Sequence, residues 1–347
     1  MNTAAVCWGQ RHQQSFSIGE MSQVGELRRG VERLAQDAGF GEVARGRAAI
    51  IASELATNIV RHAGQPGEVL VQLLDARTGE SQLELLAIDR GSGMDVDRCL
   101  RDGFSTAGTA GNGLGAVNRL ATVFDIYSAV GNGTVVLARI ARNASESAST
   151  RGVAQSIPVG AVSRAVAGEI ENGDAWRVSA TADQIGLLVV DGLGHGPLAA
   201  SAANAAAEAF LRDPFADPVD ALGSMHRALV GSRGAAASCV HIDLRTRVAS
   251  FAGVGNISVA CHADGTRKSM GGHNGTLGVT AAKPRTFQYP LPHDALLLLN
   301  SDGLQTRWSF EQYPGLSTRH PATIAAVLYA RHARQRDDVT VLAVRVP

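Results

Sequence analysis

Four aspartates in the second half of this sequence lie beside predicted strand ends, where carboxylates from separate strands can be brought to one place. They are Asp174, Asp191, Asp302 and Asp337. Hard cations such as Mg²⁺ and Mn²⁺ take oxygen ligands, and a glycine beside a carboxylate lets backbone and water approach closely. Each motif alone is equally typical of a turn. The four together predict a divalent-metal pocket.

The first of these motifs to end a strand is Asp191-Gly192-Leu193-Gly194-His195-Gly196, which follows an apolar run and turns through three glycines. His195 has the reach to act as a proton donor, but a histidine in a glycine-rich turn is more often structural. Both interpretations of His195 stay open at this point.

The first half carries a second set of polar residues with useful spacing. Glu54 and Asn58 are four positions apart and share one face of a predicted helix, where a carboxylate can polarise a hydroxyl and an amide oxygen can bind a metal. A solvated polar helix face explains the pair equally well. Asp89 follows a strand and precedes Gly91 and Gly93, which places an acceptor where an adenine amino group could donate, or makes a plain turn.

Gly111, Gly113 and Gly115 precede or open a short predicted helix. Free backbone N–H groups and the helix dipole at such a place favour phosphate. The motif is weak evidence alone, because it is neither a Walker loop nor a Rossmann fingerprint that follows a first strand.

Hydrophobic spacing predicts the elements that position these residues in the first half. Amphipathic helices are predicted at residues 24–38 and 45–62, and a short helix at residues 116–121. Strands are predicted at residues 15–18, 69–74, 83–88, 124–129 and 134–140. Helices paired with a largely antiparallel sheet make an α/β sandwich.

The second half alternates strands with two helices. The helices are predicted at residues 198–211 and 218–230. Strands are predicted at residues 162–170, 176–180, 184–190, 237–243, 248–253, 257–261, 295–300 and 339–344. This order fits two sheet layers covered by helices. Small polar residues from Asn143 onward indicate a linker at 143–153, between domains at 1–142 and 154–347.

Composition narrows the class of protein. A length of 347 residues favours two domains. Lys+Arg and Asp+Glu balance at 32 each, so no strong net electrostatic field favours nucleic acid or a membrane as partner. No apolar run is long enough to span a bilayer, and no secretory signal is apparent. The four cysteines are scattered without a Cys-x-x-Cys pair, which argues against a disulfide framework or zinc site. We expect a cytoplasmic protein.

The motifs of the first half, in their order and spacing, resemble the GHKL ATPase and kinase fold, and specifically the anti-sigma-factor serine kinases of the RsbT type. The resemblance covers residues 15–142 and implies a GHKL α/β sandwich that binds ATP with Mg²⁺. It implies Asn58 as the Mg²⁺ ligand, Glu54 as the general base and Asp89 as the residue that binds adenine. The remaining nucleotide-binding residues that it implies are Gly91, Gly93, Gly111, Gly113, Leu114 and Gly115.

The second half resembles the SpoIIE branch of the type 2C metal-dependent protein phosphatases, near the RsbX-like enzymes. Five motifs carry the resemblance in order: Gly168-Glu169, Gly173-Asp174, Asp191 to Gly196, Ser301-Asp302-Gly303-Leu304 and Asp337-Asp338. It implies an αββα sandwich. The ligands that it implies for two Mn²⁺ or Mg²⁺ ions are Asp174, Asp191, the Gly192 carbonyl, Asp302 and Asp337. Asp338 stands where related sequences often have Asn, so either of the adjacent aspartates could bind metal.

These resemblances imply a bacterial fusion of a serine/threonine kinase with a phosphatase in a partner-switching pathway. The implied substrates are STAS-domain proteins, and a sigma-factor pathway is the implied context. The alternative is a binding module in which the nucleotide domain sequesters a partner or a sigma factor and only the phosphatase is active. Transfer of the ATP γ-phosphate to a STAS protein distinguishes these two hypotheses.

Overall fold

The computed structural model describes the chain apart from residues 1–5, 10–12, 75–80, 97–112, 143–156 and 280–282. The chain forms two compact units. The first comprises residues 1–10, 151–308 and 328–347, and the second comprises residues 11–150 and 309–327. The linker predicted at 143–153 lies outside the described residues, so the domain boundary there stays a prediction.

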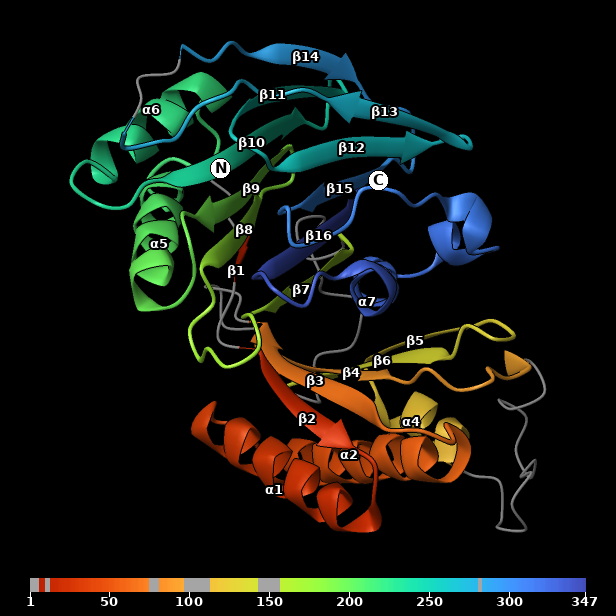
Figure 1. Cartoon of the computed structure of the whole chain (residues 1–347). Coiled ribbons are helices and arrows are strands. Elements are labelled where there is room, and N and C mark those ends of the chain that lie inside the picture. Colours follow the sequence, from red (N-terminus) through yellow and green to blue (C-terminus); the bar gives the residue numbers. More distant parts are fainter. Residues whose placement is uncertain (1–5, 10–12, 75–80, 97–112, 143–156, 280–282) are drawn as a thin grey trace. The chain divides into compact units, whose positions relative to one another are not determined.

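The second unit is a five-stranded antiparallel sheet with long helices against one face (Figure 1). The strand order is β2-β3-β4-β6-β5. The strands are β2 (Gln14–Ile18), β3 (Gly67–Leu74), β4 (Gln82–Ile88), β5 (Val123–Ser128) and β6 (Thr134–Ala141). The helices are α1 (Met21–Asp37), α2 (Glu42–His62) and α4 (Gly113–Leu120). All three predicted helices are present, although α4 begins three residues before the predicted start at 116.

Helix α1 forms because its apolar residues recur at helical spacing and its first turn is capped. Val24, Leu27, Val31 and Ala35 are buried on one face. The Gln23 side chain accepts hydrogen bonds from the backbone N–H groups of Gly19 and Glu20, which completes a capping box. On α2 the buried stripe includes four alanines, Ala44, Ala48, Ala52 and Ala56, whose small side chains let α2 pack closely.

The first unit has two sheets. The six-stranded sheet has the order β1-β8-β9-β10-β11-β14, and the five-stranded sheet has the order β13-β12-β15-β16-β7. The strands of the first are β1 (Val6–Gly9), β8 (Asp174–Ala180), β9 (Gln184–Gly192), β10 (Ala235–Asp243), β11 (Val248–Val254) and β14 (Phe287–Pro290). Those of the second are β7 (Val159–Arg164), β12 (Ser258–Ala263), β13 (Thr266–Met270), β15 (Leu296–Asn300) and β16 (Val339–Arg345).

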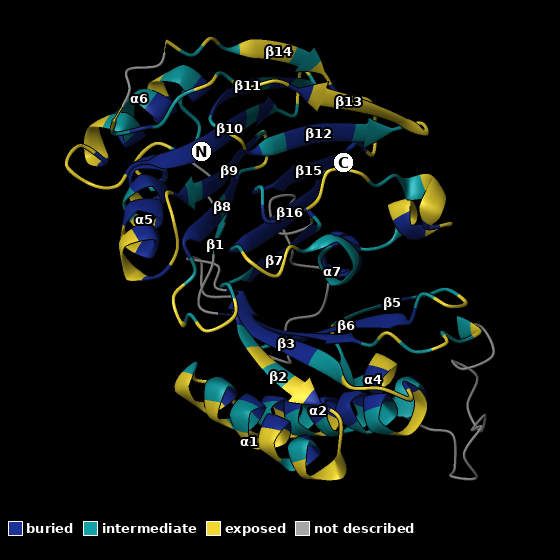
Figure 2. Ribbon diagram, in the orientation of Figure 1, coloured by how far each residue is buried: buried dark blue, intermediate teal, exposed yellow. Residues whose placement is uncertain are grey.

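Helices α5 (Pro197–Leu211) and α6 (Pro218–Ala228) pack on the six-stranded sheet, and Ala203, Ala206 and Phe210 of α5 lie in the shared core. A further helix, α7 (Pro321–His332), precedes β16 in the sequence. Strands β9, β15 and β16 are buried along nearly their whole length (Figure 2). Their ends therefore bring polar residues to the border of the core.

Several elements differ from the sequence predictions. Strand β7 ends at Arg164, whereas a strand was predicted over 162–170; Gly168 has a positive φ of 96°, which an extended strand does not allow. Strands β1, β13 and β14 and helix α7 were not predicted. Strand β1 pairs antiparallel with β8, with Val6 opposite Ala180, so the first described residues join the first unit. No helix in the described chain is long and apolar enough to cross a membrane.

Candidate active sites

Two neighbouring strands in the first unit place aspartates directly opposite each other. Asp174 begins β8 and Asp191 lies near the end of β9, and the antiparallel register pairs the two residues. Opposite residues in a pair project to the same face of a sheet, so both carboxylates point the same way. Asp174 is only 4% exposed, and its Oδ2 accepts a hydrogen bond from Ser301 Oγ at 2.7 Å.

The turn after Asp191 requires glycine at its first position. A Cβ at Gly192 would collide with the carbonyl oxygen of Ala199 in α5, so no larger residue fits there. The Gly192 N–H donates to the Gly173 carbonyl at 2.9 Å, which joins the turn to the residue before Asp174. Gly194 and Gly196 have positive φ angles of 86° and 74°. This backbone carries the chain from β9 into α5 within five residues.

Asp302 follows β15 and is held from two sides. Asn256 Nδ2 donates to Asp302 Oδ2 at 2.6 Å. A Cβ at Gly303 would collide with the Asp338 carbonyl oxygen, so the two loops touch through backbone alone. The Ser301 N–H donates to the Thr340 carbonyl at 3.0 Å, which fixes the end of β15 beside the start of β16.

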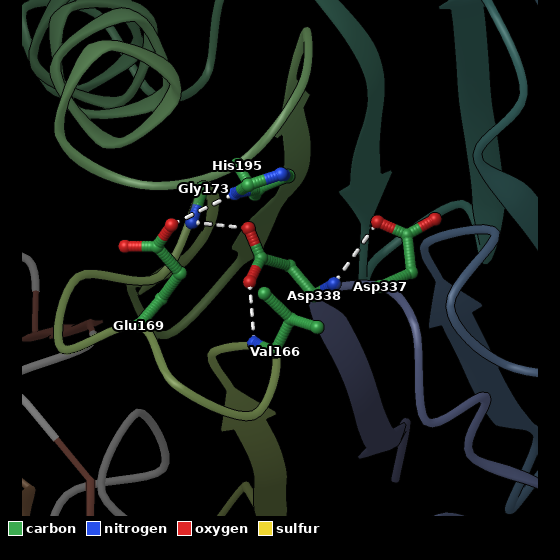
Figure 3. A network of polar contacts seen from close by, with 6 residues as sticks. All are labelled: Val166, Glu169, Gly173, His195, Asp337 and Asp338. Atoms are coloured by element: carbon green, nitrogen blue, oxygen red, sulfur yellow. Dashed lines mark hydrogen bonds and ion pairs between the residues drawn. The ribbon is translucent and has the colours of Figure 1, made fainter.

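The adjacent aspartates before β16 have different surroundings (Figure 3). The carboxylate of Asp338 accepts from the backbone N–H of Val166 at Oδ1 and of Gly173 at Oδ2, both at 2.7 Å, and the residue is 2% exposed. Asp337 Oδ1 accepts from the Asp338 N–H at 3.0 Å. Asp338 thus joins the two ends of the 166–173 segment, and Asp337 lies beside Asp302.

The carboxylates repel one another. Burial, and then the carboxylates of Asp302, Asp337 and Asp338, raise the pKa of Asp191 to about 7. Burial and the Asp191 carboxylate raise the pKa of Asp174 well above its ordinary range. Burial and the Asp302 carboxylate raise the pKa of Asp337. Such a cluster is stable in its ionised form only when cations neutralise it, so these residues fit divalent ions.

Among the residues that the structure describes, no three His, Cys, Asp or Glu side chains converge to form a metal site by themselves. Ions held here would take their remaining ligands from backbone oxygens and from water. Mg²⁺ commonly binds in this way, through one or two carboxylates and several waters.

His195 is held by Glu169, an acid of the Gly168-Glu169 motif to which the sequence assigned no role. Its Nδ1 lies 2.9 Å from Glu169 Oε1, and its ring remains largely exposed (Figure 3). Glu169 also fills the space beside Gly196, since a Cβ there would lie 3.0 Å from Glu169 Oε2. The sequence signal for Glu169 was the Gly168-Glu169 pair. Ser301 and Asn256, which position Asp174 and Asp302, had no assigned role either.

In the second unit, Glu54 and Asn58 converge on the start of α4. A Cβ at Gly113 would lie 2.9 Å from Glu54 Oε2 and 3.4 Å from Asn58 Oδ1. Glycine therefore avoids a close contact with the Glu54 carboxylate. Asn58 Nδ2 is buried and has no hydrogen-bond partner in the described part of the chain. A buried amide without a partner is unusual in a native fold, and it suits a place that a ligand completes.

Asp89 stands at the end of β4 and organises the turn that follows. Its Oδ1 accepts from the backbone N–H of Gly91 at 2.8 Å and of Thr134 at 3.2 Å. A Cβ at Gly91 would lie 2.8 Å from the Ala63 carbonyl oxygen, and Gly93 has a positive φ of 78°. Gly113, Leu114 and Gly115 form the first turn of α4. The predicted residue Gly111 lies outside the described residues.

Comparison with known proteins adds to this geometry. Residues 19–140 match the family described as the histidine kinase-like ATPase domain, and residues 181–347 match the family described as Stage II sporulation protein E (SpoIIE). The serine/threonine-protein kinase RsbT of Bacillus subtilis (strain 168) is 39% identical over 106 residues, which cover 30% of this chain and 78% of RsbT. This chain belongs to the RsbT family, with a SpoIIE-family domain fused to it.

A chain from a solved structure of the bacterial stressosome, described as a modular system adapted to control secondary messenger signaling, is 30% identical with a TM-score of 0.51. That match covers 55% of this chain and 99% of the other. The predicted family resemblances and α/β fold class are confirmed. The protein is an enzyme that joins a domain of the protein-serine/threonine kinase type to a domain of the protein phosphatase type.

Proposed function

We propose that this fusion is a cytoplasmic partner-switching regulator that acts on STAS-domain proteins in a sigma-factor or stressosome-type pathway. The RsbT-family half phosphorylates a serine or threonine of such a protein, and the SpoIIE-family half removes the phosphoryl group. The observation that carries the proposal is that each unit holds its own set of polar side chains. One unit has Glu54 with Asn58, and the other has the carboxylates around Asp191.

In the kinase half, Asn58 would hold the Mg²⁺ of ATP through its amide oxygen, and Asp89 would accept a hydrogen bond from the adenine amino group. The N–H groups at the start of α4, from Gly113 to Gly115, face the phosphates in this proposal. Glu54 lies next to Gly113 and would accept the proton of the attacking hydroxyl. One turn of helix between Glu54 and Asn58 keeps base and metal ligand on the same side.

In the phosphatase half, Asp174, Asp191, Asp302, Asp337 and the Gly192 carbonyl would hold two Mn²⁺ or Mg²⁺ ions. When bound, such ions supply a water of lowered pKa and neutralise the phosphoryl oxygens. Ser301 and Asn256 orient the carboxylates of Asp174 and Asp302. His195, whose Nδ1 contacts Glu169, would donate a proton to the departing hydroxyl oxygen.

The proposal is tested with two variants of the full chain and one purified STAS protein. Glu54→Ala should abolish transfer of the ATP γ-phosphate and leave metal-dependent dephosphorylation intact. Asp302→Ala should do the reverse, so that the phosphorylated partner accumulates. Both variants should bind the partner and fold as the parent does, measured by circular dichroism.

The outcomes separate the two hypotheses about the first half. If the parent binds a STAS protein and ATP but transfers no phosphate, the first half sequesters its partner and the kinase assignment is wrong. If loss of either site silences both reactions in folded variants, the two halves form one coupled catalytic unit and the independent-domain proposal is wrong.

A further inference from the structure

An arginine with no assigned role lies against the glycine turn of the phosphatase site. Nη1 of Arg233 would be 2.9 Å from a Cβ placed on Gly194, the residue two positions after Gly192. Gly194 therefore serves two purposes, because it allows the positive φ of the turn and leaves room for the guanidinium. The Arg233 side chain is exposed.

The backbone around Arg233 is held in place on both sides. Ser232 Oγ donates to the Leu229 carbonyl at 2.7 Å and accepts from the Gly234 N–H at 3.0 Å. The Gly234 carbonyl accepts from the N–H of Leu193 at 3.0 Å, and Ala235 then pairs with Gly192 in the β9–β10 ladder. The turn that carries Arg233 is thus hydrogen-bonded to the turn that carries Gly192.

The positive charge of Arg233 is available to a ligand. Within the described chain it makes no hydrogen bond or ion pair, although the acidic cluster lies nearby. The guanidinium therefore lies beside the glycine turn with its donors unoccupied by any carboxylate of the described chain.

We propose that Arg233 binds the non-bridging oxygens of the substrate phosphoryl group in the phosphatase site, an inference that rests on the proposed phosphatase function. A phosphate monoester carries two negative charges near neutral pH, and the planar guanidinium offers parallel N–H donors that match two of its oxygens. Cations held by the carboxylates would neutralise part of this charge, and the guanidinium of Arg233 would add charge-assisted hydrogen bonds to the phosphoryl oxygens. The substrate class is a phosphoserine or phosphothreonine monoester. Inorganic phosphate, the product, would bind at the same place.

The test uses the full chain with Mn²⁺ and measures inhibition by inorganic phosphate during hydrolysis of para-nitrophenyl phosphate. Arg233→Ala should raise the inhibition constant of phosphate and the KM for para-nitrophenyl phosphate by roughly tenfold to a hundredfold, the loss expected for charge-assisted hydrogen bonds. Arg233→Lys keeps the charge but not the planar fork, so its phosphate inhibition constant and KM should lie between those of the parent and of Arg233→Ala. Mn²⁺ affinity by calorimetry should not change.

Arg227→Ala is the matched control, because Arg227 is exposed on α6 and its guanidinium donates to Ser224 of its own helix. It should behave as the parent does. An unchanged phosphate inhibition constant in folded Arg233→Ala would overturn the proposal, even if KM for a phosphoprotein rose, because Arg233 would then contact the protein and not the phosphoryl group. A parent enzyme that hydrolyses no phosphomonoester with Mn²⁺ would instead refute the phosphatase function itself.

Discussion

Replacing Asp191 with asparagine should stabilise the metal-free phosphatase half at pH 8, even though it removes a proposed metal ligand. The side chain accepts no hydrogen bond in the described structure, so asparagine can replace it in shape without breaking one. What changes is the charge. In the parent, an ionised Asp191 is surrounded by the carboxylates of Asp302, Asp337 and Asp338.

The size of the effect follows from the pKa of Asp191, which burial and these carboxylates raise from 3.8 to about 7. Because the folded protein holds this proton more tightly than the unfolded chain, the contribution to stability is complete below pH 4. It is lost as pH rises to about 7, at about 1.4 kcal/mol per pH unit. Between pH 5 and pH 8 the parent should therefore lose about 3 kcal/mol that Asp191→Asn does not lose.

The assay is urea unfolding in EDTA at pH 5 and pH 8, followed by tryptophan fluorescence. All three tryptophans, Trp8, Trp176 and Trp308, belong to the first unit, so fluorescence reports on the phosphatase half alone. The difference in unfolding free energy between variant and parent should grow by about 3 kcal/mol over this pH range. Asp220→Asn, at an exposed position on α6, should change stability by less than about 0.5 kcal/mol at both pH values.

Saturating Mn²⁺ should reverse the order, because it stabilises the parent and not the variant. An equal difference in unfolding free energy between variant and parent at pH 5 and pH 8 in EDTA would contradict a raised pKa of Asp191. In that case Asp191 would titrate near its ordinary value, and its neighbours would not form an electrostatically strained cluster.

Two further predictions concern other carboxylates. Glu84 is fully buried and accepts from Gln72 at 2.6 Å and from Arg139 at 2.8 Å across three strands, so Glu84→Ala should destabilise the second unit by about 3–5 kcal/mol in calorimetry. Glu32→Ala, which breaks an exposed ion pair with Arg28, should cost less than about 1 kcal/mol; equal losses would contradict the argument. Asp338→Asn should lower the urea midpoint of the first unit, because the amide NH₂ that replaces one carboxylate oxygen cannot accept a hydrogen bond from Val166 or Gly173, whereas Asp337→Asn should weaken Mn²⁺ binding with little loss of stability. The reverse pattern would exchange the roles of the two aspartates.

The central strands and amphipathic helices could be predicted because their signals are local. Helices α1 and α2 carry apolar residues at helical spacing, and strands β3, β4, β9 and β15 are short runs of mostly apolar residues. Such patterns exist because each element buries a continuous face or the whole strand. The glycines and aspartates that follow the strands were visible for the same reason, since a strand end is marked by the residue that stops it.

Elements without a local pattern were missed. Strand β13 exposes four of its five residues and β14 exposes three of four, so neither has an apolar face to detect. Helix α7 is rich in alanine and largely buried around its circumference, which removes the contrast between two faces. Strand β1 has four residues and owes its conformation to pairing with β8, which is about 170 positions away in sequence. The conformation of these four elements depends on tertiary contacts.

The sequence could not predict which of the adjacent residues Asp337 and Asp338 is the metal ligand. Both are carboxylates in one loop, and spacing alone gives no reason to prefer either as a ligand. The distinction comes from backbone donors far away in sequence, because the N–H groups of Val166 and Gly173 occupy both oxygens of Asp338. The β7–β16 ladder ends at the Arg164–Val339 pair, and the residues just beyond it, Val166 and Asp338, are joined by a backbone-to-carboxylate bond in place of strand pairing. The long-range bonds of Asp338 thus leave Asp337 as the preferred proposed ligand.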